Sequence, residues 1–169
     1  NLTSVTELDA VQTRHFLDSL SVAQAVPEPT LKSGRLVDIG SGAGFPGLPL
    51  KIAFPGLRVT LNDSTAKKTA FLSHLVDALE LDGVEVLTGR AETLAHQPEL
   101  RGTFDLVVAR AVANLAVLAE LTLPFCRVGG LVVAHKSSGS EDEIERARQA
   151  IETMGGELRN AVPVRIPGE

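Results

Sequence analysis

The chain has 169 residues, and its 16 Lys and Arg stand against 21 Asp and Glu, so the net charge is −5 with the four His neutral. This length fits one domain with a substantial core, and the 44% apolar and 22% charged residues exclude wholesale disorder. The negative charge argues mildly against nucleic acid as a partner, and the absence of Trp and Tyr leaves only the six Phe for base stacking.

The predicted elements follow one another as in an α/β protein. Short β-rich runs alternate with helical stretches, which indicates a mostly parallel, doubly wound sheet. In chain order, strands are expected over residues 35–39, 57–62, 84–88, 104–109, 131–135 and 157–166. Helices are expected over residues 6–23, 45–54, 65–80, 114–123 and 140–154. We therefore predict a single domain over 1–169, with the sheet and its helices over 35–166 and an N-terminal helical segment over 1–30 as a lid or appendage.

The ends of the chain and its surroundings can also be predicted. The chain begins at Asn1 without a methionine and stops at Glu169, after a turn-like sequence, so we expect both ends to be trimmed. No apolar run reaches the roughly 18–20 residues of a membrane helix. No signal-peptide pattern opens the sequence, so a cytoplasmic protein is expected.

A glycine-rich loop, DIGSGAGFPG over 38–47, follows the first predicted strand. A strand, a glycine loop and a helix N-terminus together are typical of a nucleotide-cofactor site, because glycines admit close backbone approach and the helix end offers free N–H donors. One register, Gly42, Gly44 and Gly47, fits the dinucleotide spacing G-x-G-x-x-G.

A second register of the same loop fits the acid-x-G-x-G-x-G pattern of S-adenosylmethionine (SAM) methyltransferases. It comprises Asp38, Gly40, Gly42 and Gly44. The apolar strand ends directly before Gly40, which places the turn there. This register also explains an acid on a buried strand, because Asp38 would lie near the cationic amino group of the methionine moiety. We therefore favour SAM over a dinucleotide.

Three further positions fall at the predicted ligand ends of the strands. Asp63 ends the second strand, where it can accept hydrogen bonds from ribose hydroxyls, cap the next helix, or do both. Glu92, after the third strand, can approach an adenine edge or cap a turn. Arg110 closes the fourth strand, where it lines the cleft or pairs with a loop acid.

The side chains exclude some reactions. Cys126 is the single cysteine, so no disulfide framework or multi-cysteine zinc site can form. It enters the fifth strand away from the loop ends, which argues against covalent attack on cytosine. Methylation of a ring nitrogen with a free lone pair, such as guanine N7, needs no base. His15, His74, His96 and His135 show no metal-site spacing, so no metal is expected.

The sequence resembles the RsmG (GidB) family, the bacterial 16S ribosomal RNA guanine-N7 methyltransferases, over nearly its whole length. The glycine loop alone would suit many SAM enzymes, and the other elements are more specific. The matching elements are Asn1-Leu2-Thr3-Ser4, Arg14-His15, Leu17-Asp18-Ser19, Asp38 to Gly47, Asp63-Ser64, Lys67-Lys68, Phe71-Leu72, Arg90-Ala91-Glu92, Arg110-Ala111 and Lys136.

The resemblance implies site residues and a substrate. Cofactor contacts are expected at Asp38, Gly40, Gly42, Gly44, Phe45, Asp63, Ala91, Glu92 and Arg110. RNA contacts are expected at Arg14, His15, Lys67, Lys68 and Lys136. No acid or base is assigned, and Arg110 and Lys136 are candidates for positioning the RNA. The family usually has a glycine directly after this lysine, where the present chain has Ser137.

We therefore expect a class I methyltransferase fold and methyl transfer from SAM to guanine N7, at guanine 527 by the resemblance. The substrate would be 16S rRNA or the small ribosomal subunit, and the protein a monomer. The alternatives are an NAD(P)-dependent oxidoreductase, a non-catalytic domain that has kept the fold, and a SAM methyltransferase for a protein or a small molecule.

Overall fold

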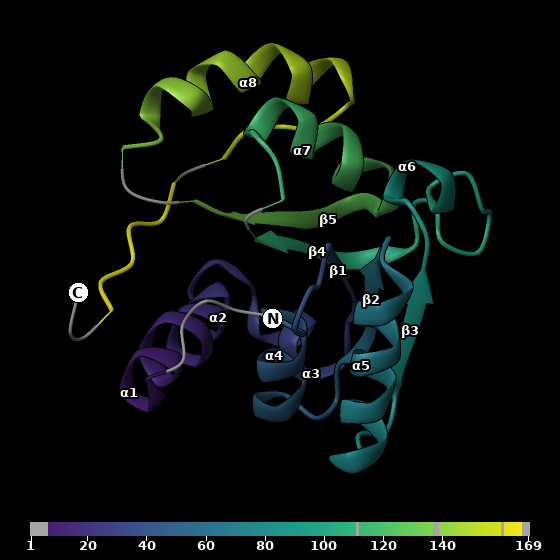
Figure 1. Cartoon of the computed structure of the whole chain (residues 1–169). Helices are drawn as coiled ribbons and strands as arrows, with labels where there is room; N and C mark the ends of the chain where they lie inside the picture. The colour runs from purple at the N-terminus through teal and green to yellow at the C-terminus, as the bar shows by residue number, and fades with distance from the viewer. Residues whose placement is uncertain (1–6, 111, 137–138, 160, 167–169) are drawn as a thin grey trace.

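A five-stranded parallel sheet, in the order β3-β2-β1-β4-β5, lies at the centre of the structure (Figure 1). The computed structural model describes residues 7–110, 112–136, 139–159 and 161–166. The strands are β1 Arg35–Ile39, β2 Arg58–Asp63, β3 Val84–Thr88, β4 Phe104–Arg110 and β5 Cys126–His135. After β1 the chain passes to β2 on one side, and β4 lies on the other, so the strand order reverses between β1 and β4. Ligands of open α/β sheets bind at such a point.

Helices cover both faces of the sheet. They are α1 Leu8–Val11, α2 Asp18–Leu20, α3 Glu28–Ser33, α4 Gly47–Ala53, α5 Ala66–Ala78, α6 Ala91–Leu94, α7 Leu115–Thr122 and α8 Glu141–Thr153. Three further helical segments are η1 Gln12–Leu17, η2 Ser21–Ala25 and η3 Leu123–Phe125. In Figure 1, α7 and α8 lie above the sheet, and α3, α4 and α5 lie below it. No helix in the described part of the chain is long and apolar enough to cross a membrane.

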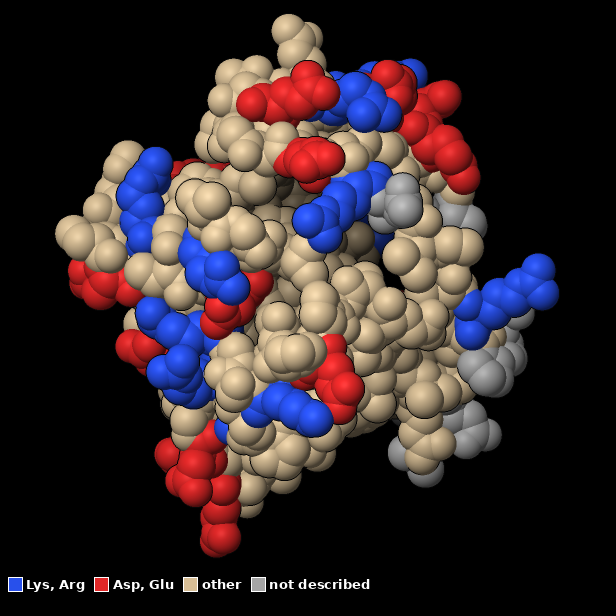
Figure 2. Space-filling view, turned by 180° about the vertical axis from the view of Figure 1, so that it is seen from behind, with Lys and Arg blue, Asp and Glu red and all other residues tan. Residues whose placement is uncertain are grey.

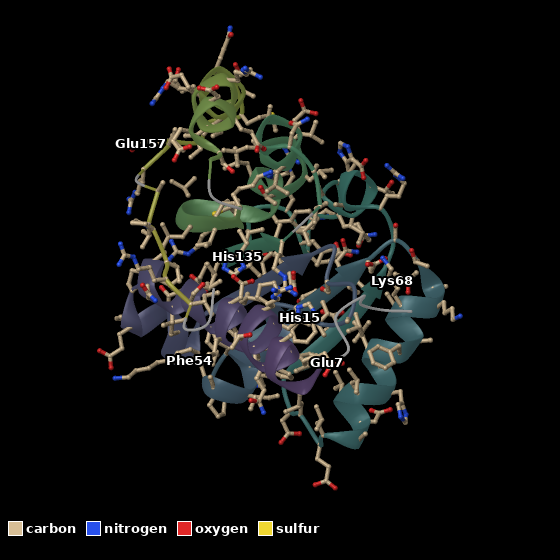
Figure 3. All side chains as sticks on the ribbon, turned by 60° about the vertical axis from the view of Figure 1, so that its left-hand side comes forward. Glu7, His15, Phe54, Lys68, His135 and Glu157 are labelled. Carbon is tan, nitrogen blue, oxygen red and sulfur yellow. The ribbon has the colours of Figure 1, made fainter. Side chains whose placement is uncertain are left out.

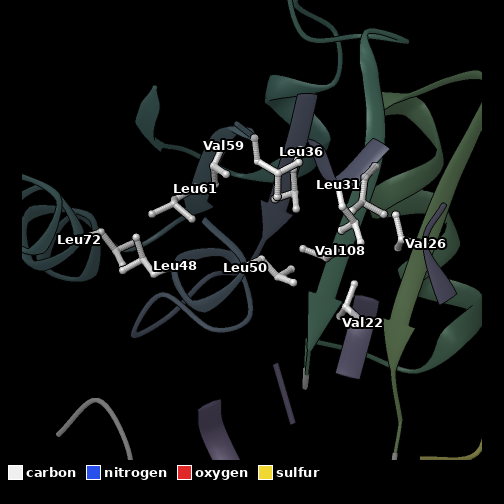
Figure 4. Close-up of a cluster of buried hydrophobic side chains, with 12 residues drawn as sticks. Val22, Val26, Leu31, Leu36, Leu48, Leu50, Val59, Leu61, Leu72 and Val108 are labelled. Carbon is white, nitrogen blue, oxygen red and sulfur yellow. The ribbon is translucent and has the colours of Figure 1, made fainter. Parts of the chain in front are cut away.

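Successive side chains along a strand point to opposite faces of the sheet, so a hydrophobic core forms on each face. Leu36 of β1 packs on one face with Leu31, Leu50 and Val108, in the cluster drawn in Figure 4. Val37 packs on the other face, against residues of α6, α7 and η3. Because consecutive residues enter opposite cores, residues 36–39 of β1 are all buried.

The predicted doubly wound fold is confirmed, with differences at its short elements. Five of the six predicted strands are present, and β5 begins five residues earlier than predicted. Helices α3 and α6 were not predicted because each is only one or two turns long. Helix α4 begins at Gly47 rather than at residue 45, with Pro46 as its N-cap residue.

The predicted strand over 157–166 is wrong. Residues 157–159 and 161–166 have no regular structure. Pro163 interrupts the segment and has no N–H to donate to a neighbouring strand. Val162 and Val164 are 46% and 38% exposed, whereas Leu158 packs against the apolar cluster of α7 and α8. Apolar and polar residues do alternate in this segment, but its described residues pair with no strand of the sheet.

The N-terminal segment is helical, as predicted, but it is not one regular helix. From Leu8 to Ala25 it runs through α1, the π-helical η1, α2 and the 3-10 helix η2. It packs against α4 and β5, beside the carboxyl ends of the central strands. The predictions for residues 1–6, 111, 137–138, 160 and 167–169 lie outside the described residues.

Candidate active site at the carboxyl ends of the strands

The glycine loop is held in a conformation that glycine alone adopts easily. Gly40, Gly42 and Gly44 have φ angles of +73°, +59° and +97°. A Cβ atom on Gly40 would come within 2.7 Å of Val112 Cγ2, and one on Gly44 would clash with Leu48. A Cβ on Gly42 would meet only the Gly40 carbonyl, at 3.9 Å. The loop is therefore tight against the protein at both ends and open at its middle, where a ligand can approach the backbone.

The loop geometry agrees with the acid-x-G-x-G-x-G register. The positive φ angles begin at Gly40, directly after β1, as that register requires. Gly47 is the first residue of α4, and a Cβ there would come within 2.6 Å of Leu61 and 2.9 Å of the Asp38 carboxylate. Gly47 thus allows α4 to pack closely on β1 and β2.

Asp38 connects β1 to α4. Its side chain is fully buried, and Oδ2 accepts a hydrogen bond from the Gly47 N–H at 2.9 Å. The other oxygen, Oδ1, has no hydrogen-bond partner among the described residues. Burial raises the pKa of Asp38 to about 7, and the bond from Gly47 opposes this rise only in part. The site therefore contains a buried acceptor that a cationic group can use.

Asp63 connects the glycine loop to α5. Its carboxylate accepts hydrogen bonds from the N–H groups of Gly42 at 3.2 Å and Thr65 at 2.9 Å. The Lys68 ammonium donates to the same carboxylate at 3.2 Å. Burial alone would raise the pKa of Asp63, but the Thr65 and Lys68 bonds outweigh it and lower the pKa. Asp63 is not the N-cap of α5, as one prediction had it: the N-cap residue is Thr65, which makes no side-chain cap hydrogen bond, and Asp63 only accepts from the N–H of that residue.

Asn62 is a structural member of the site that sequence reasoning missed. Its side-chain Nδ2 donates to the carbonyls of Leu87 at 3.2 Å and Gly89 at 2.9 Å. Its backbone carbonyl accepts from the Ser41 N–H at 2.8 Å. The available signal in the sequence was an asparagine directly before the acid that ends the second strand. The structure shows that this asparagine is buried. Asn62 therefore joins β2 to the loops that follow β1 and β3.

Ala91 and Glu92 lie where the prediction placed them, at the carboxyl end of β3. Ala91 is buried and begins α6. The Glu92 side chain is 51% exposed and pairs with Arg90 at 2.9 Å. The Glu92 backbone N–H and the Arg90 guanidinium lower the pKa of Glu92, so this carboxylate is ionised at neutral pH.

Arg110 gathers several of the predicted residues. Its guanidinium carbon lies 5.2 Å from the centre of the Phe45 ring, and His15 stacks on the same ring at 4.9 Å. Its Nη1 donates to the Asp18 carboxylate at 2.8 Å and to the Arg14 carbonyl at 3.3 Å. The structure thus joins the glycine loop, the end of β4 and the N-terminal segment. Sequence reasoning missed the partner role of Asp18.

His135, to which the sequence analysis assigned no role in the site, adjoins this cluster. It ends β5 and is the sheet neighbour of Arg110. Its Nδ1 lies 3.6 Å from Asp18 Oδ2, and its Nε2 lies 3.4 Å from the Ser21 hydroxyl. Burial lowers the pKa of His135, so the ring is neutral near pH 7. Figure 3 shows His15 and His135 in the region where the N-terminal segment meets the sheet.

Lys136 follows β5 and is bound to the loop after β4. Its ammonium donates to the Ala113 carbonyl at 2.8 Å and pairs with Glu143 at 2.6 Å. The same Glu143 oxygen accepts from the Leu115 N–H at 2.6 Å. Lys136 and Glu143 therefore hold the start of α7. Lys67 is also exposed.

Cys126 lies at the opposite end of the sheet. It begins β5, whereas the glycine loop follows the carboxyl end of β1. Burial raises the pKa of the Cys126 thiol, which leaves it protonated and poorly nucleophilic. Within the described residues, no group of three or more His, Cys, Asp or Glu is placed to hold a metal ion.

Comparison with known proteins agrees with this geometry. The family model described as GidB, rRNA small subunit methyltransferase G, matches residues 1–166. The chain belongs to this family. The Ribosomal RNA small subunit methyltransferase G of Roseiflexus sp. (strain RS-1) is 53% identical over 168 residues, which cover 99% of this chain and 70% of that protein. The protein of the same name from Dehalococcoides mccartyi (strain CBDB1) is 49% identical with the same coverage. The resemblance to the RsmG family is confirmed.

Solved structures of low identity share the fold. A SAM-dependent methyltransferase from Aquifex aeolicus superposes with a TM-score of 0.61 at 18% identity, covering 88% of this chain and 83% of that one. Coclaurine N-methyltransferase, bound to N-methylheliamine and SAH, also gives 0.61 at 18% identity, covering 78% of this chain and 37% of that one. The predicted class I methyltransferase fold of this RsmG-family chain is confirmed.

Proposed function

We propose that this RsmG-family chain transfers a methyl group from SAM to N7 of a guanine in 16S rRNA, guanine 527 by family resemblance. The observation that carries the proposal is the loop of Gly40, Gly42 and Gly44, which opens beside the strand-order reversal in a chain of this family. The match to the family distinguishes this function from an NAD(P)-dependent oxidoreductase and from methylation of proteins or small molecules.

Two features of the loop fit SAM. The first is the open space beside Gly42, the middle glycine of the loop, where a methionine moiety can lie against the backbone. The second is Asp38 Oδ1, a buried acceptor without a described partner, which suits the cationic amino group of that moiety. The remaining contacts we propose are Asp63 at the ribose, Ala91 and Glu92 at the adenine, and Phe45 and Arg110 along the cleft.

The chemistry places few demands on the protein. When bound, SAM supplies a methyl group that its sulfonium has already activated. Guanine N7 attacks through a free lone pair, so no side chain has to remove a proton from that atom. The chain's residues then have to align the base with the methyl group and exclude water. Extraction of the base from its stack costs about a few kcal/mol. We assign no catalytic acid or base, and Arg110 and Lys136 position the substrate.

We propose that the RNA contacts are made by basic residues around this site. They are Arg14, His15, Lys67, Lys68 and Lys136. On the face drawn in Figure 2, charges of both signs are interspersed and no broad basic patch is seen. Lys68 and Lys136 are paired with acids, so an RNA phosphate has to compete with Asp63 and Glu143. We propose 16S rRNA or the small subunit as the partner of a cytoplasmic monomer.

The test is methyl transfer from tritiated SAM to small ribosomal subunits that lack the modification, followed by mapping of the labelled nucleotide. We expect the label at a single guanine. Chemical cleavage specific for N7-methylguanine should cut the RNA at that nucleotide. Absence of label from rRNA, or calorimetric heat with NADH and none with SAM, would contradict the proposal. Labelling of a protein instead would favour a different methyltransferase.

A matched pair of arginine variants refines this test. Arg110→Ala should retain the fold and lower methyl transfer by at least about tenfold, because a charged hydrogen-bond donor leaves the cleft. Arg148→Ala removes an arginine that pairs with Glu145 on the exposed side of α8, and it should transfer methyl groups normally. Unfolding of Arg110→Ala, seen by circular dichroism, would show that Arg110 is structural instead.

A further inference from the structure

Asp18 lies between the last residues of two neighbouring strands. Its Oδ2 accepts from Arg110 Nη1 at 2.8 Å and lies 3.6 Å from His135 Nδ1. Arg110 and His135 are paired in the register of β4 and β5. One carboxylate of the N-terminal segment therefore contacts the carboxyl ends of both strands.

Arg110 is partly buried and has a single carboxylate partner among the described residues. Its side chain is 17% exposed and that of Asp18 is 29% exposed, so solvent screens this ion pair only in part. The other polar neighbours of the guanidinium are uncharged oxygen and nitrogen atoms of Arg14 and His15. Burial and, less strongly, proximity to Arg110 lower the pKa of His15, so this ring is neutral near pH 7.

The ion pair fixes the guanidinium and leaves part of it accessible. Nη1 donates to both Asp18 and the Arg14 carbonyl, and His15 Nδ1 lies 3.4 Å from Nη2. Nε has no hydrogen-bond partner in the described part of the chain. The guanidinium carbon lies over the ring of Phe45, the residue after Gly44. Asp18 thus sets the orientation of a group that borders the glycine loop.

We propose that Asp18 is a positioning residue for cofactor binding, which acts by holding the Arg110 guanidinium over Phe45. The inference rests on the proposed SAM site. Without Asp18, the long arginine side chain regains rotamers that point away from the loop, and the ordering has to occur when the cofactor binds. The N-terminal segment then forms part of the lining of the cofactor site.

The test is a double-mutant cycle read by calorimetric titration with SAM. Asp18→Asn keeps the size of the side chain and removes its charge, and we expect it to weaken SAM binding about tenfold. In the Arg110→Gln background, the same Asp18→Asn change should alter SAM affinity less than twofold, because the group that Asp18 positions is gone. Glu145→Gln, on the exposed face of α8, is the control and should bind SAM as the wild type does.

Each other outcome overturns the inference. Unchanged affinity in Asp18→Asn, or equal losses in both backgrounds, would mean that Asp18 does not act through Arg110. Tighter binding would mean that the Asp18 carboxylate competes with the cofactor. If Asp18→Asn fails to fold, Asp18→Ala, which favours a helix, takes its place in the cycle. A wild-type chain that binds no SAM would refute the proposed function itself, which is a distinct result.

Discussion

The buried carboxyl of Asp38 predicts how stability depends on pH. Its pKa is raised from 3.8 to about 7, because burial disfavours the charged form. The native protein therefore holds this proton more tightly than the unfolded chain does. The contribution to stability is fully present below pH 3.8 and is lost as the pH rises through 7. The whole shift corresponds to about 4 kcal/mol, of which about 3 kcal/mol falls between pH 5 and pH 8.

Asp38→Asn removes this titration. The amide oxygen of the variant can still accept from the Gly47 N–H, so the connection to α4 is kept. We expect the wild type to lose about 3 kcal/mol more free energy of unfolding than the variant between pH 5 and pH 8. Urea unfolding of both proteins at several pH values measures this difference. The two proteins share every other side chain, so contributions from the rest of the chain cancel.

Parallel stability curves for the two proteins would refute the reasoning. They would mean that the Asp38 carboxyl has the same pKa in the native and unfolded states. Water would then hydrate this carboxyl in the native protein. A wild type that gains stability relative to the variant as the pH rises would mean that Asp38 is stabilised as an anion by a cation close to Oδ1.

Two further predictions concern the loops. Gly44→Ala should lower the free energy of unfolding by about 1–3 kcal/mol, because φ is +97° and a Cβ meets Leu48. Gly42→Ala, with open space around its Cβ, should cost less stability, and the reverse order in thermal unfolding would contradict the geometry. Glu143→Gln weakens the contacts to Lys136 and Leu115, and we expect about fivefold slower methyl transfer with an unchanged circular dichroism spectrum. A normal rate would mean that these contacts do not hold the loop after β4.

The central strands were predictable because buried parallel strands read as short apolar runs between turn residues. Leu106 to Ala109 is such a run, and every one of its residues is buried. The final strand was not predictable in the same way, because the alternation around Val162 and Val164 does not depend on whether a partner strand exists. Short helices such as α6 lack enough residues to show a helical period.

The sequence predicts those parts of the site whose positions depend only on the order of the strands. The parallel order brings the glycine loop, Asp63 and Arg110 to one edge of the sheet, and their positions follow from where the strands end. The contact of Asp18 with Arg110 joins residues 92 positions apart. It depends on how an irregular helical segment docks on the sheet, and no local pattern specifies that docking.

Hydrogen bonds around Asn62 make one side of the site stiff. The loops after β1 and β3 are joined to β2 by backbone and amide hydrogen bonds, including Ser41 N–H to the Asn62 carbonyl and Asn62 Nδ2 to the Gly89 carbonyl. The other side, formed by the N-terminal segment and the loop after β4, is joined to the sheet through contacts at Asp18 and Lys136. A ligand that lies on the stiff side meets a preorganised surface and loses little affinity to ordering it. The energetic cost of adapting to different substrates then falls on the opposite side.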